Sequence, residues 1–306
     1  MVNAEKSLMS VRGLTKVFKS GVFRPKYTVA VEDVSFDLKP GTTLSLIGES
    51  GSGKTTIGKL ILKLLKPTAG HIYYKDRDIG EITEKNEVKA YYRKVQGIFQ
   101  DPFATFNPLY RVDRIFEMLF TSLGYDQANK DERIHQVLND VNLNADLILG
   151  KFPHQLSGGQ LQRLLIARAL LMDVEILVAD ELISMLDAST RIEILNYLAA
   201  LCKRKGMSVL FITHDLNLGY YISDYTMIMY QGRLVEQGAT EKIYQNPIHP
   251  YTKMLFASVP DINQKWDRGE KFLPEQVVEQ IQKFYAENKG RGIEEVEADH
   301  SVLFSI

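Results

Sequence analysis

The sequence predicts an α/β fold in which helices cover a mostly parallel sheet and a glycine-rich loop follows one central strand. Three short runs, at 44–47, 176–179 and 209–212, are apolar and bounded by turn or polar residues, as parallel strands buried on both faces are. Longer stretches with helical periodicity separate these runs. Strands that alternate with helices imply right-handed crossovers and therefore a parallel sheet.

Length and composition narrow the class of protein. The 306 residues are enough for one large domain with an appendage, and 45% hydrophobic with 25% charged residues is ordinary for a globular protein. The formal net charge of −1 provides no basic field that would attract nucleic acid, so no nucleic-acid partner is expected. Cys202 is the only cysteine, which excludes a disulfide framework and an iron–sulfur cluster held by cysteines of one chain.

No targeting or membrane-spanning segment is expected. The first residues lack the continuous apolar core of a signal peptide. No run approaches the ~18 apolar residues of a spanning helix. Activity at a membrane would therefore require docking onto another protein that spans it.

Some regions depart from the alternating pattern. Residues 1–40 contain three short strand-like runs and predict an antiparallel β subdomain. Residues 112–150 are polar with a helical pattern, which predicts a helical subdomain inserted at about 112–170. A further helix is expected between Pro274 and Gly290. Its apolar face comprises Val277, Val278, Ile281, Phe284 and Tyr285. This face is expected to pack either on the core or on a partner.

The glycine-rich loop matches the phosphate-binding pattern GxxxxGK[ST]. Its residues are Gly48, Glu49, Ser50, Gly51, Ser52, Gly53, Lys54 and Thr55, with Thr56 included in the predicted site. Glycines let successive N–H groups point at phosphate oxygens. The following helix, expected to start near Lys54 and to include 57–65, adds the attraction of its positive end. Lys54 suits the β- and γ-phosphates, and the Thr55 hydroxyl suits magnesium. A chance glycine-rich turn is the alternative, but such a match arises in only about one chain per hundred.

Two further motifs allow both a plain and a functional interpretation. Residues 156–160 read LSGGQ, which forms either an ordinary capped helix N-terminus or a second anion site. The apolar strand 176–179 runs into Asp180 and Glu181, and in isolation such a pair is more often a solvated strand end.

The order of these motifs carries a resemblance. Along the chain stand the phosphate loop, Gln100 in GIFQDP, LSGGQ, the strand ending in Asp180-Glu181, Asp187 in SMLD, and His214 after the strand SVLFIT. This order resembles the ABC ATPase family over residues 8–260. The resemblance implies a P-loop NTPase core that binds ATP and Mg²⁺. It also implies a dimer that encloses two ATP molecules head to tail, with each LSGGQ facing the partner's phosphate loop.

The resemblance also implies roles for single residues. Glu181 is expected to be the general base for the attacking water, while Asp180, Gln100 and Thr55 are expected at magnesium. His214 is expected to hold the γ-phosphate and Glu181; a lone histidine would more often be a capping or core residue. The remaining ATP-binding set is Ser157, Gly158, Gly159, Gln160 and Asp187, of which Ser157 and Gly159 contact the γ-phosphate of the partner's site and Asp187 couples the two sites.

An aromatic residue in the first strand is expected to stack on adenine. Phe18, which follows GLTK, is preferred to Tyr27. Packing of this side chain on the protein surface is the alternative.

Three segments resemble the oligopeptide/dipeptide/nickel importer group: GESGSGKTT, QDPFATFNPLYRV and QNPIHPYTKMLFASVP. The resemblance implies a motor subunit at the cytoplasmic face of the membrane that drives permease subunits and serves an extracytoplasmic binding protein indirectly. Residues 1–260 form the expected ATPase domain, 261–306 an extension of the group's type, and 101–116 the surface that receives a permease helix. Peptides are the expected cargo, with oligosaccharides or nickel as alternatives, and the dimer is either homomeric or heteromeric.

The sequence departs from the group in two places. The segment DELISMLD carries Leu182 and Met185 where the family usually has proline and alanine, and the change is expected to affect coupling more than chemistry. The tail ADHSVLF contains no cysteine, so no iron–sulfur cluster is expected. A soluble ABC ATPase acting on DNA or ribosomes, and an inactive regulatory subunit, are the rival interpretations. The first would carry a coiled-coil insertion or a second nucleotide domain, and intact Lys54, Glu181 and His214 argue against the second.

Overall fold

The computed structural model describes residues 7–21, 24–122, 126–172, 174–183, 186–258 and 274–306. The chain divides into two compact units. The first unit comprises the residues up to Ile79 together with those from Phe211 onward, and the second comprises Gly80–Leu210. The boundary passes through strand β8 (Ser208–Thr213).

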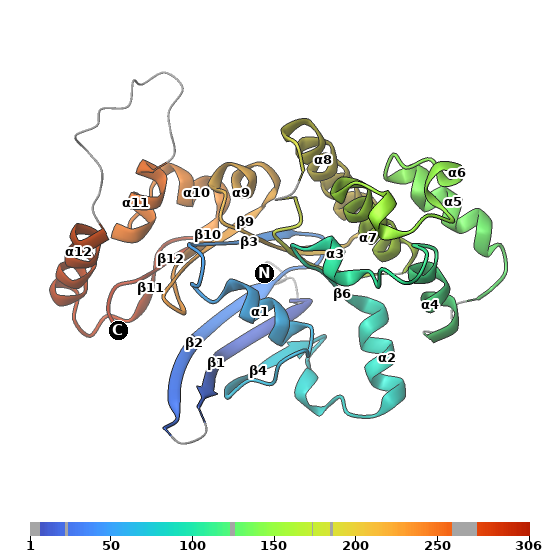
Figure 1. Ribbon diagram of the computed structural model, residues 1–306. Coiled ribbons are helices and arrows are strands. Elements are labelled where there is room, and N and C mark those ends of the chain that lie inside the picture. Colours follow the sequence, from blue (N-terminus) through green and yellow to red (C-terminus); the bar gives the residue numbers. More distant parts are fainter. Residues whose placement is uncertain (1–6, 22–23, 123–125, 173, 184–185, 259–273) are drawn as a thin grey trace, which may run out of the picture. The chain divides into compact units, whose positions relative to one another are not determined.

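An antiparallel sheet occupies the N-terminal part of the first unit. Its strand order is β2-β1-β4-β5 (Figure 1), with β1 at Met9–Ser20, β2 at Lys26–Leu38, β4 at Ala69–Tyr74 and β5 at Arg77–Asp78. All three strand pairs are antiparallel, which confirms the predicted β subdomain. The short predicted runs merge into two long strands because bulges shift the register of β1 and β2 without ending their pairing.

A second sheet of the first unit has the strand order β11-β12-β10-β9-β3-β8. Its further strands are β3 (Thr43–Ile47), β9 (Tyr225–Tyr230), β10 (Arg233–Ala239), β11 (Ile293–Glu297) and β12 (His300–Leu303). Strand β3 pairs in parallel with β9, and all five of its residues are buried, as predicted for its apolar run. The C-terminal strands extend the sheet with antiparallel pairs, an extension that the sequence analysis did not predict.

Among the described residues, the helices of the first unit are α1 (Lys54–Ile61), α9 (Leu216–Ile222), α10 (Thr240–Gln245), α11 (Pro250–Ala257) and α12 (Pro274–Glu287). The predicted start near Lys54 is confirmed, since α1 begins at Lys54, directly after Gly53. The predicted extension of the helix to Leu65 is wrong, because α1 stops at Ile61. Lys63 has a φ of 53°, a left-handed conformation that a helix cannot continue through.

Helix α12 packs on the core of its own unit (Figure 1). Val277 and Ile281 are buried in one hydrophobic cluster with Tyr251 and Leu303. Val278 is 41% exposed, so the buried face of α12 is narrower than the apolar face predicted from the sequence. Of the two alternatives left open for this helix, the structure shows packing on the core.

In the second unit, β6 (Val95–Ile98) and β7 (Ile176–Asp180) form a parallel pair. The helices of this unit are α2 (Lys85–Lys94), α3 (Pro102–Thr105), α4 (Arg114–Ser122), α5 (Lys130–Asp140), α6 (Ala145–Ile148), α7 (Gly158–Leu171) and α8 (Ala188–Lys205). Three of them, α4 to α6, fill the stretch that was predicted to be helical. Helix α8 ends at Gly206 with a φ of 63°, the predicted C-terminal cap.

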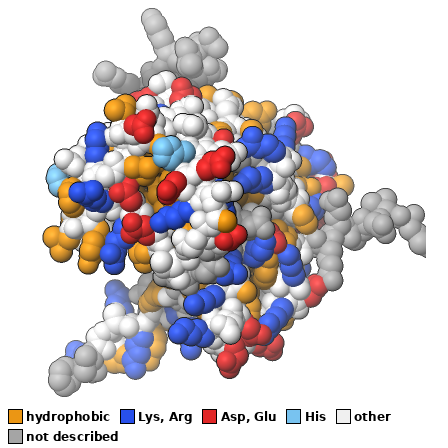
Figure 2. All heavy atoms as spheres, turned by 90° about the vertical axis from the view of Figure 1, so that its right-hand side faces the viewer, with side chains coloured by type: hydrophobic (Ala, Val, Ile, Leu, Met, Phe, Trp, Pro, Cys, Tyr) orange, Lys and Arg blue, Asp and Glu red, His pale blue; other side chains and the backbone are white. Residues whose placement is uncertain are grey.

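Charges of both signs are mixed on the face of the molecule that Figure 2 draws. Figure 2 shows Lys and Arg side chains interspersed with Asp and Glu side chains over the face drawn. This pattern agrees with the formal net charge of −1, since a mixed surface produces only a weak long-range field.

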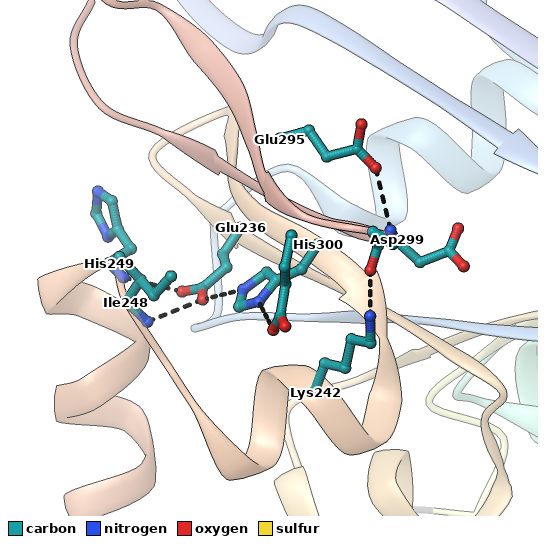
Figure 3. A network of polar contacts seen from close by, with 9 residues as sticks. Glu236, Lys242, Ile248, His249, Glu295, Asp299 and His300 are labelled. Atoms are coloured by element: carbon teal, nitrogen blue, oxygen red, sulfur yellow. Dashed lines mark hydrogen bonds and ion pairs between the residues drawn. The ribbon is translucent and has the colours of Figure 1, made fainter.

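The C-terminal strands are fixed by a buried ion pair (Figure 3). The Nε2 of His300 lies 2.8 Å from a carboxylate oxygen of Glu236 on β10, and its Nδ1 lies 3.2 Å from Glu297. The side chains of His300 and Glu236 are fully buried. Burial alone would lower the pKa of His300, but the hydrogen bonds and charges of the two carboxylates outweigh it and raise the pKa.

This ion pair predicts a pH-dependent contribution to stability. Because the folded-state pKa of His300 is raised, protonated His300 stabilises the folded state. This stabilisation is fully present below the unfolded-state pKa of about 6.5 and is lost as the pH rises through the folded-state pKa. We expect His300→Gln to lower the melting temperature by several degrees at pH 6. The difference from the parent should shrink toward pH 9. The matched control is His135→Gln on the exposed face of α5, and a difference for His300→Gln that grows with pH would contradict the assignment.

Candidate functional site

The phosphate loop joins β3 to α1 in the first unit. Gly51 and Gly53 have φ angles of 84° and 104°, so the backbone turns in a way that favours glycine. The Gly53 carbonyl accepts the first helical hydrogen bond from Ile57 at 3.1 Å. The turn therefore brings the loop directly onto the N-terminus of α1, as the motif predicts.

Two glycines of this loop are enclosed by backbone. A Cβ on Gly48 would lie 2.2 Å from the Met229 carbonyl oxygen, and one on Gly53 would lie 2.2 Å from the Ala30 carbonyl oxygen. Both distances are far below van der Waals contact. The loop is therefore packed between β9 and β2 so closely that only glycine fits at these positions.

Lys54 folds back across the loop. Its Nζ donates to the carbonyl oxygens of Gly48 and Glu49, both at 2.7 Å, and to the Ser52 hydroxyl at 3.3 Å. The side chain is almost fully buried. The charge of Lys54 thus lies over the loop that its motif assigns to phosphate, while Thr55, in the first turn of α1, is exposed.

Phe18 and Tyr27 lie near the ends of β1 and β2. Phe18 is opposite Thr28 and Tyr27 is opposite Lys19, so the two aromatic rings project from opposite faces of the ribbon. Phe18 is 39% and Tyr27 is 61% exposed. The Nζ of Lys16 lies 5.3 Å from the centre of the Phe18 ring. The geometry shows that a ligand on one face of the ribbon meets only one of these rings.

His214 stands between β8 and α9 and is exposed. The next residue, Asp215, caps α9 by accepting hydrogen bonds from the N–H groups of Asn217 and Leu218. The amide of Asp215 in turn donates to the Thr213 hydroxyl. The backbone on the C-terminal side of His214 is thereby fixed.

In the second unit, Asp180 is the last residue of β7 and Glu181 directly follows the strand. Asp180 is 4% exposed, and Glu181 is more open and has a φ of 48°. A left-handed conformation is uncommon for a non-glycine residue and is frequent at functional sites. Leu182 is fully buried, so the residue that replaces the usual proline is held by apolar packing. Met185 lies outside the described residues.

The LSGGQ motif opens helix α7. The Ser157 hydroxyl accepts from the N–H of Gln160 at 3.2 Å, and the side-chain oxygen Oε1 of Gln160 accepts from the N–H of Ser157 at 2.9 Å. This capping box confirms the predicted helix cap. Gly158 and Gly159 form the first turn of the helix, where the N–H groups have no partner within the helix.

Asp187 and Gln100 flank two other helix starts of the second unit. Asp187 caps α8 by accepting from the Ser189 hydroxyl at 2.6 Å and the Thr190 N–H at 3.0 Å. These hydrogen bonds hold the pKa of Asp187 well below its usual value. Gln100 is exposed and directly precedes Asp101, the cap of α3.

The predicted residues fall into two sets. The phosphate loop, Phe18 and His214 belong to the first unit, and Gln100, Asp180, Glu181, LSGGQ and Asp187 belong to the second. The oxygen atoms of Thr55, Gln100 and Asp180 are of the chemical type that magnesium prefers. The residue set therefore fits this cation.

One contact of the phosphate loop was missed by the sequence analysis. The hydroxyl of Tyr251, in the segment HPYT, accepts a hydrogen bond from the N–H of Glu49 at 3.1 Å. The two residues are 202 positions apart. The segment HPYT itself was the only signal that could have pointed to the contact.

Two family models match the chain. Residues 31–184 match the model described as ABC transporter. Residues 235–286 match the model described as oligopeptide/dipeptide transporter, C-terminal region. Together the matches cover the phosphate loop, LSGGQ and the C-terminal segment that includes Tyr251.

Curated proteins with similar sequences carry names of peptide transport. The chain is 38% identical over 261 residues to the oligopeptide transport ATP-binding protein AppF of Bacillus subtilis, covering 84% of this chain and 79% of that protein. It is 40% identical over 261 residues, with the same coverage, to the dipeptide transport ATP-binding protein DppF of Haemophilus influenzae.

The fold matches a solved ATP-binding cassette. That structure is described as a dimeric post-hydrolysis state bound to ADP and Pi. It has a TM-score of 0.67 and 27% sequence identity, and the match covers 76% of this chain and 98% of that chain. The predicted fold class is thereby confirmed.

The enclosure of the phosphate loop predicts different effects at its two left-handed glycines. Gly51→Ala introduces only backbone strain of about 1–2 kcal/mol, since no atom lies within 4 Å of its Cβ position. Gly53→Ala introduces similar strain and also a clash with the Ala30 carbonyl. We expect both variants to lower the melting temperature, and Gly53→Ala clearly more, as measured by circular dichroism. Equal losses would show that the enclosure does not constrain the loop.

Proposed function

Since this chain belongs to the ABC transporter family, in its oligopeptide and dipeptide group, we propose that it is the ATP-hydrolysing motor subunit of a peptide importer. The observation that carries this assignment is the match of residues 235–286 to the C-terminal region of oligopeptide and dipeptide transporters. The proposed ATPase domain spans residues 1–260 and the extension spans 261–306. Uptake of radiolabelled peptides into cells or vesicles that contain the complete transporter tests the cargo, with oligosaccharides and nickel as the competing substrates.

The phosphate loop is the proposed site for the triphosphate. Its amides and the N-terminus of α1 attract the phosphate oxygens. Lys54, now bonded to two carbonyl oxygens of the loop, exchanges them for the β- and γ-phosphates. Because the lysine charge is already buried over the loop, little reorganisation is needed when the ligand arrives. The adenine is proposed to stack on Phe18.

Hydrolysis is assigned to residues of both units. Glu181 is proposed as the general base that takes a proton from the attacking water. Gln100 orients this water, and His214 holds the γ-phosphate. Magnesium, held by Thr55, Gln100 and Asp180, would supply charge neutralisation at the phosphates.

A second ATPase subunit is the proposed partner across the nucleotide. The cassette of similar fold is described as a dimer. We propose that the first turn of α7, with Ser157, Gly158, Gly159 and Gln160, contacts the γ-phosphate bound by the partner. The positive end of α7 suits this contact because the ligand is an anion. Asp187, at the start of α8, is proposed to couple the two sites.

The proposed location is the cytoplasmic face of the membrane. Among the described residues, none of the helices has both the length and the apolar character needed to cross a bilayer. Contact with permease subunits is proposed at 101–116, where large apolar side chains are exposed: Phe103, Leu109 and Tyr110. Such side chains mark an interaction surface. An extracytoplasmic binding protein takes part indirectly.

Replacement of Lys54 tests the assignment to ATP. Lys54→Ala removes a point charge from the phosphates and should abolish ATP hydrolysis and sharply weaken nucleotide binding. Binding is measured with a fluorescent ATP analogue and hydrolysis by phosphate release. Lys59→Ala, on the exposed side of α1, is the matched control and should behave like the parent. Parental turnover in Lys54→Ala would remove the proposed mechanism.

Replacement of Glu181 tests the general base. Glu181→Gln retains size and hydrogen bonding but cannot accept the proton of water, so ATP hydrolysis should fall by about 100-fold or more while ATP binding persists. Size-exclusion chromatography with ATP and Mg²⁺ should then show an accumulated dimer. Glu132→Gln, exposed on α5, is the control. A monomeric Glu181→Gln variant with normal turnover would exclude Glu181 as the base.

A further inference from the structure

The C-terminal region contacts the phosphate loop through the side chain of Tyr251. This residue lies in α11 and is fully buried, and its hydroxyl accepts the hydrogen bond from Glu49 N–H at 3.1 Å. Burial raises the pKa of Tyr251, so the hydroxyl stays neutral and the bond persists at any physiological pH. Glu49 is the second residue of the phosphate loop. A side chain from the end of the chain therefore determines the orientation of a peptide group in the loop.

The two polar backbone groups of Glu49 are held by different partners. Its N–H is held by Tyr251, and its carbonyl oxygen accepts from Lys54 Nζ at 2.7 Å and from Ser52 N–H at 3.2 Å. When Lys54 turns to phosphate, the Glu49 carbonyl loses its charged donor. The bond to Tyr251 does not involve Lys54 and can remain, so the loop keeps an anchor that is independent of the nucleotide.

Tyr251 is itself held in place by His249. The Nδ1 of His249 accepts from the N–H of Tyr251 at 3.2 Å, so this nitrogen carries no proton. The proton is therefore on Nε2, which donates to the Tyr285 hydroxyl of α12 at 3.2 Å. Burial lowers the pKa of His249 to about 4, although the negative charge of Glu236 acts in the opposite direction. The lowered pKa keeps the imidazole ring neutral in this arrangement.

The start of α11 is also tied to the sheet (Figure 3). The Glu236 carboxylate accepts from the backbone N–H groups of Ile248 at 2.9 Å and His249 at 3.0 Å while it pairs with His300. Strands β10 and β12 and helix α12 thus converge on the residues that orient Tyr251. All these partners belong to the same compact unit as the phosphate loop.

A cavity of about 580 Å³ adjoins this contact. Its lining includes the loop residues Glu49–Ser52 and, from α11 and α12, Tyr251, Met254, Leu255 and Val277. Apolar packing between the loop and these two helices is therefore incomplete. The hydrogen bond of the Tyr251 hydroxyl supplies a directed contact between α11 and the loop.

We propose that Tyr251 is a positioning residue for nucleotide binding, through which the C-terminal region holds the phosphate loop in its ligand-ready form. The inference rests on the proposed function of the loop. Tyr251 does not touch the phosphates in this account and acts through the Glu49 amide. A loop that is ordered in advance loses less conformational entropy when the ligand binds, so the expected effect is on affinity.

Removal of one oxygen atom tests the proposal. In Tyr251→Phe the ring and its tilted contact with the Tyr230 ring, 4.4 Å between centroids, are retained, and the hydrogen bond to Glu49 is lost. We expect the Kd for the fluorescent ATP analogue to rise about fivefold, the equivalent of a hydrogen bond of about 1 kcal/mol. The KM for ATP should rise with it, while kcat at saturating ATP stays near the parental value.

Tyr230→Phe is the matched control because it removes a hydroxyl from the ring that contacts Tyr251. This hydroxyl accepts a hydrogen bond from the Gln231 side chain. Tyr230→Phe should retain the parental Kd. In the absence of nucleotide, the melting temperatures of Tyr230→Phe and Tyr251→Phe should both lie within a few degrees of the parental value. Tyr285→Phe offers an independent variant, since it loosens Tyr251 only through His249. Tyr285→Phe should raise the Kd by a smaller factor than Tyr251→Phe does. The double variant should have nearly the same Kd as Tyr251→Phe alone.

An unchanged Kd in Tyr251→Phe, or an equal rise in Tyr230→Phe, would overturn the proposal and leave the ATPase assignment intact. A fall in kcat without a change in KM would likewise overturn it, because the residue would then act on the chemical step. Failure of the parental protein to bind the analogue would instead contradict the proposed function itself. The two hypotheses therefore fail by different observations.

Discussion

The close approach of backbone to the phosphate loop is the constraint on which the nucleotide site depends. Gly48 and Gly53 face carbonyl oxygens of β9 and β2 at distances that leave no room for a side chain. The N–H of Gly232 also donates to the Ser52 carbonyl at 3.0 Å. Since neighbouring strands enclose the loop from two sides, its amides are presented to a ligand by the sheet and not by the loop alone. Order of this kind lowers the entropic cost of binding an anion.

This constraint also explains the place of the C-terminal region. Strands β9 and β10 and helix α11 pack around the hydrophobic cluster that contains Ile47, the last residue of β3 before the loop. Tyr251 belongs to the same cluster and adds a polar contact to Glu49. The C-terminal elements therefore support the strand by apolar burial and the loop by a hydrogen bond. The two contributions differ physically, because burial is non-directional whereas a hydrogen bond orients the peptide group that it holds.

Sequence reasoning predicted features that depend on local pattern. The buried strands β3, β7 and β8 were visible as short apolar runs, and the caps at Ser157 and Gly206 follow from the chemistry of single residues. Features that depend on tertiary contact were missed or misplaced. Strand β11 reads IEEVE, whose charged residues resemble a solvated loop, because its order comes from pairing with β12 and not from apolar alternation. The early end of α1 at Ile61 could not be inferred either, since nothing in KLLK marks Lys63 as left-handed.

The same distinction applies to the site. Motif spacing identified the phosphate loop, the two carboxylates at the end of β7 and the capped start of α7, because each is a contiguous segment with its own chemistry. The role proposed for Tyr251 depends on a contact across 202 positions, and the segment HPYT does not by itself identify Glu49 as the partner.

The exchange of ATP for ADP has a thermodynamic consequence for the proposed motor. The residues proposed to bind phosphate belong to one unit and those proposed to activate water to the other. A ligand favours the state of a protein for which it has the higher affinity, by the difference in affinity between the states. The proposed contacts of Lys54 and His214 with the γ-phosphate are lost when ATP is hydrolysed and phosphate leaves, so ADP is expected to bind more weakly than ATP. Under the proposed function, the hydrogen bond between Tyr251 and Glu49 keeps the phosphate loop anchored through this change of ligand.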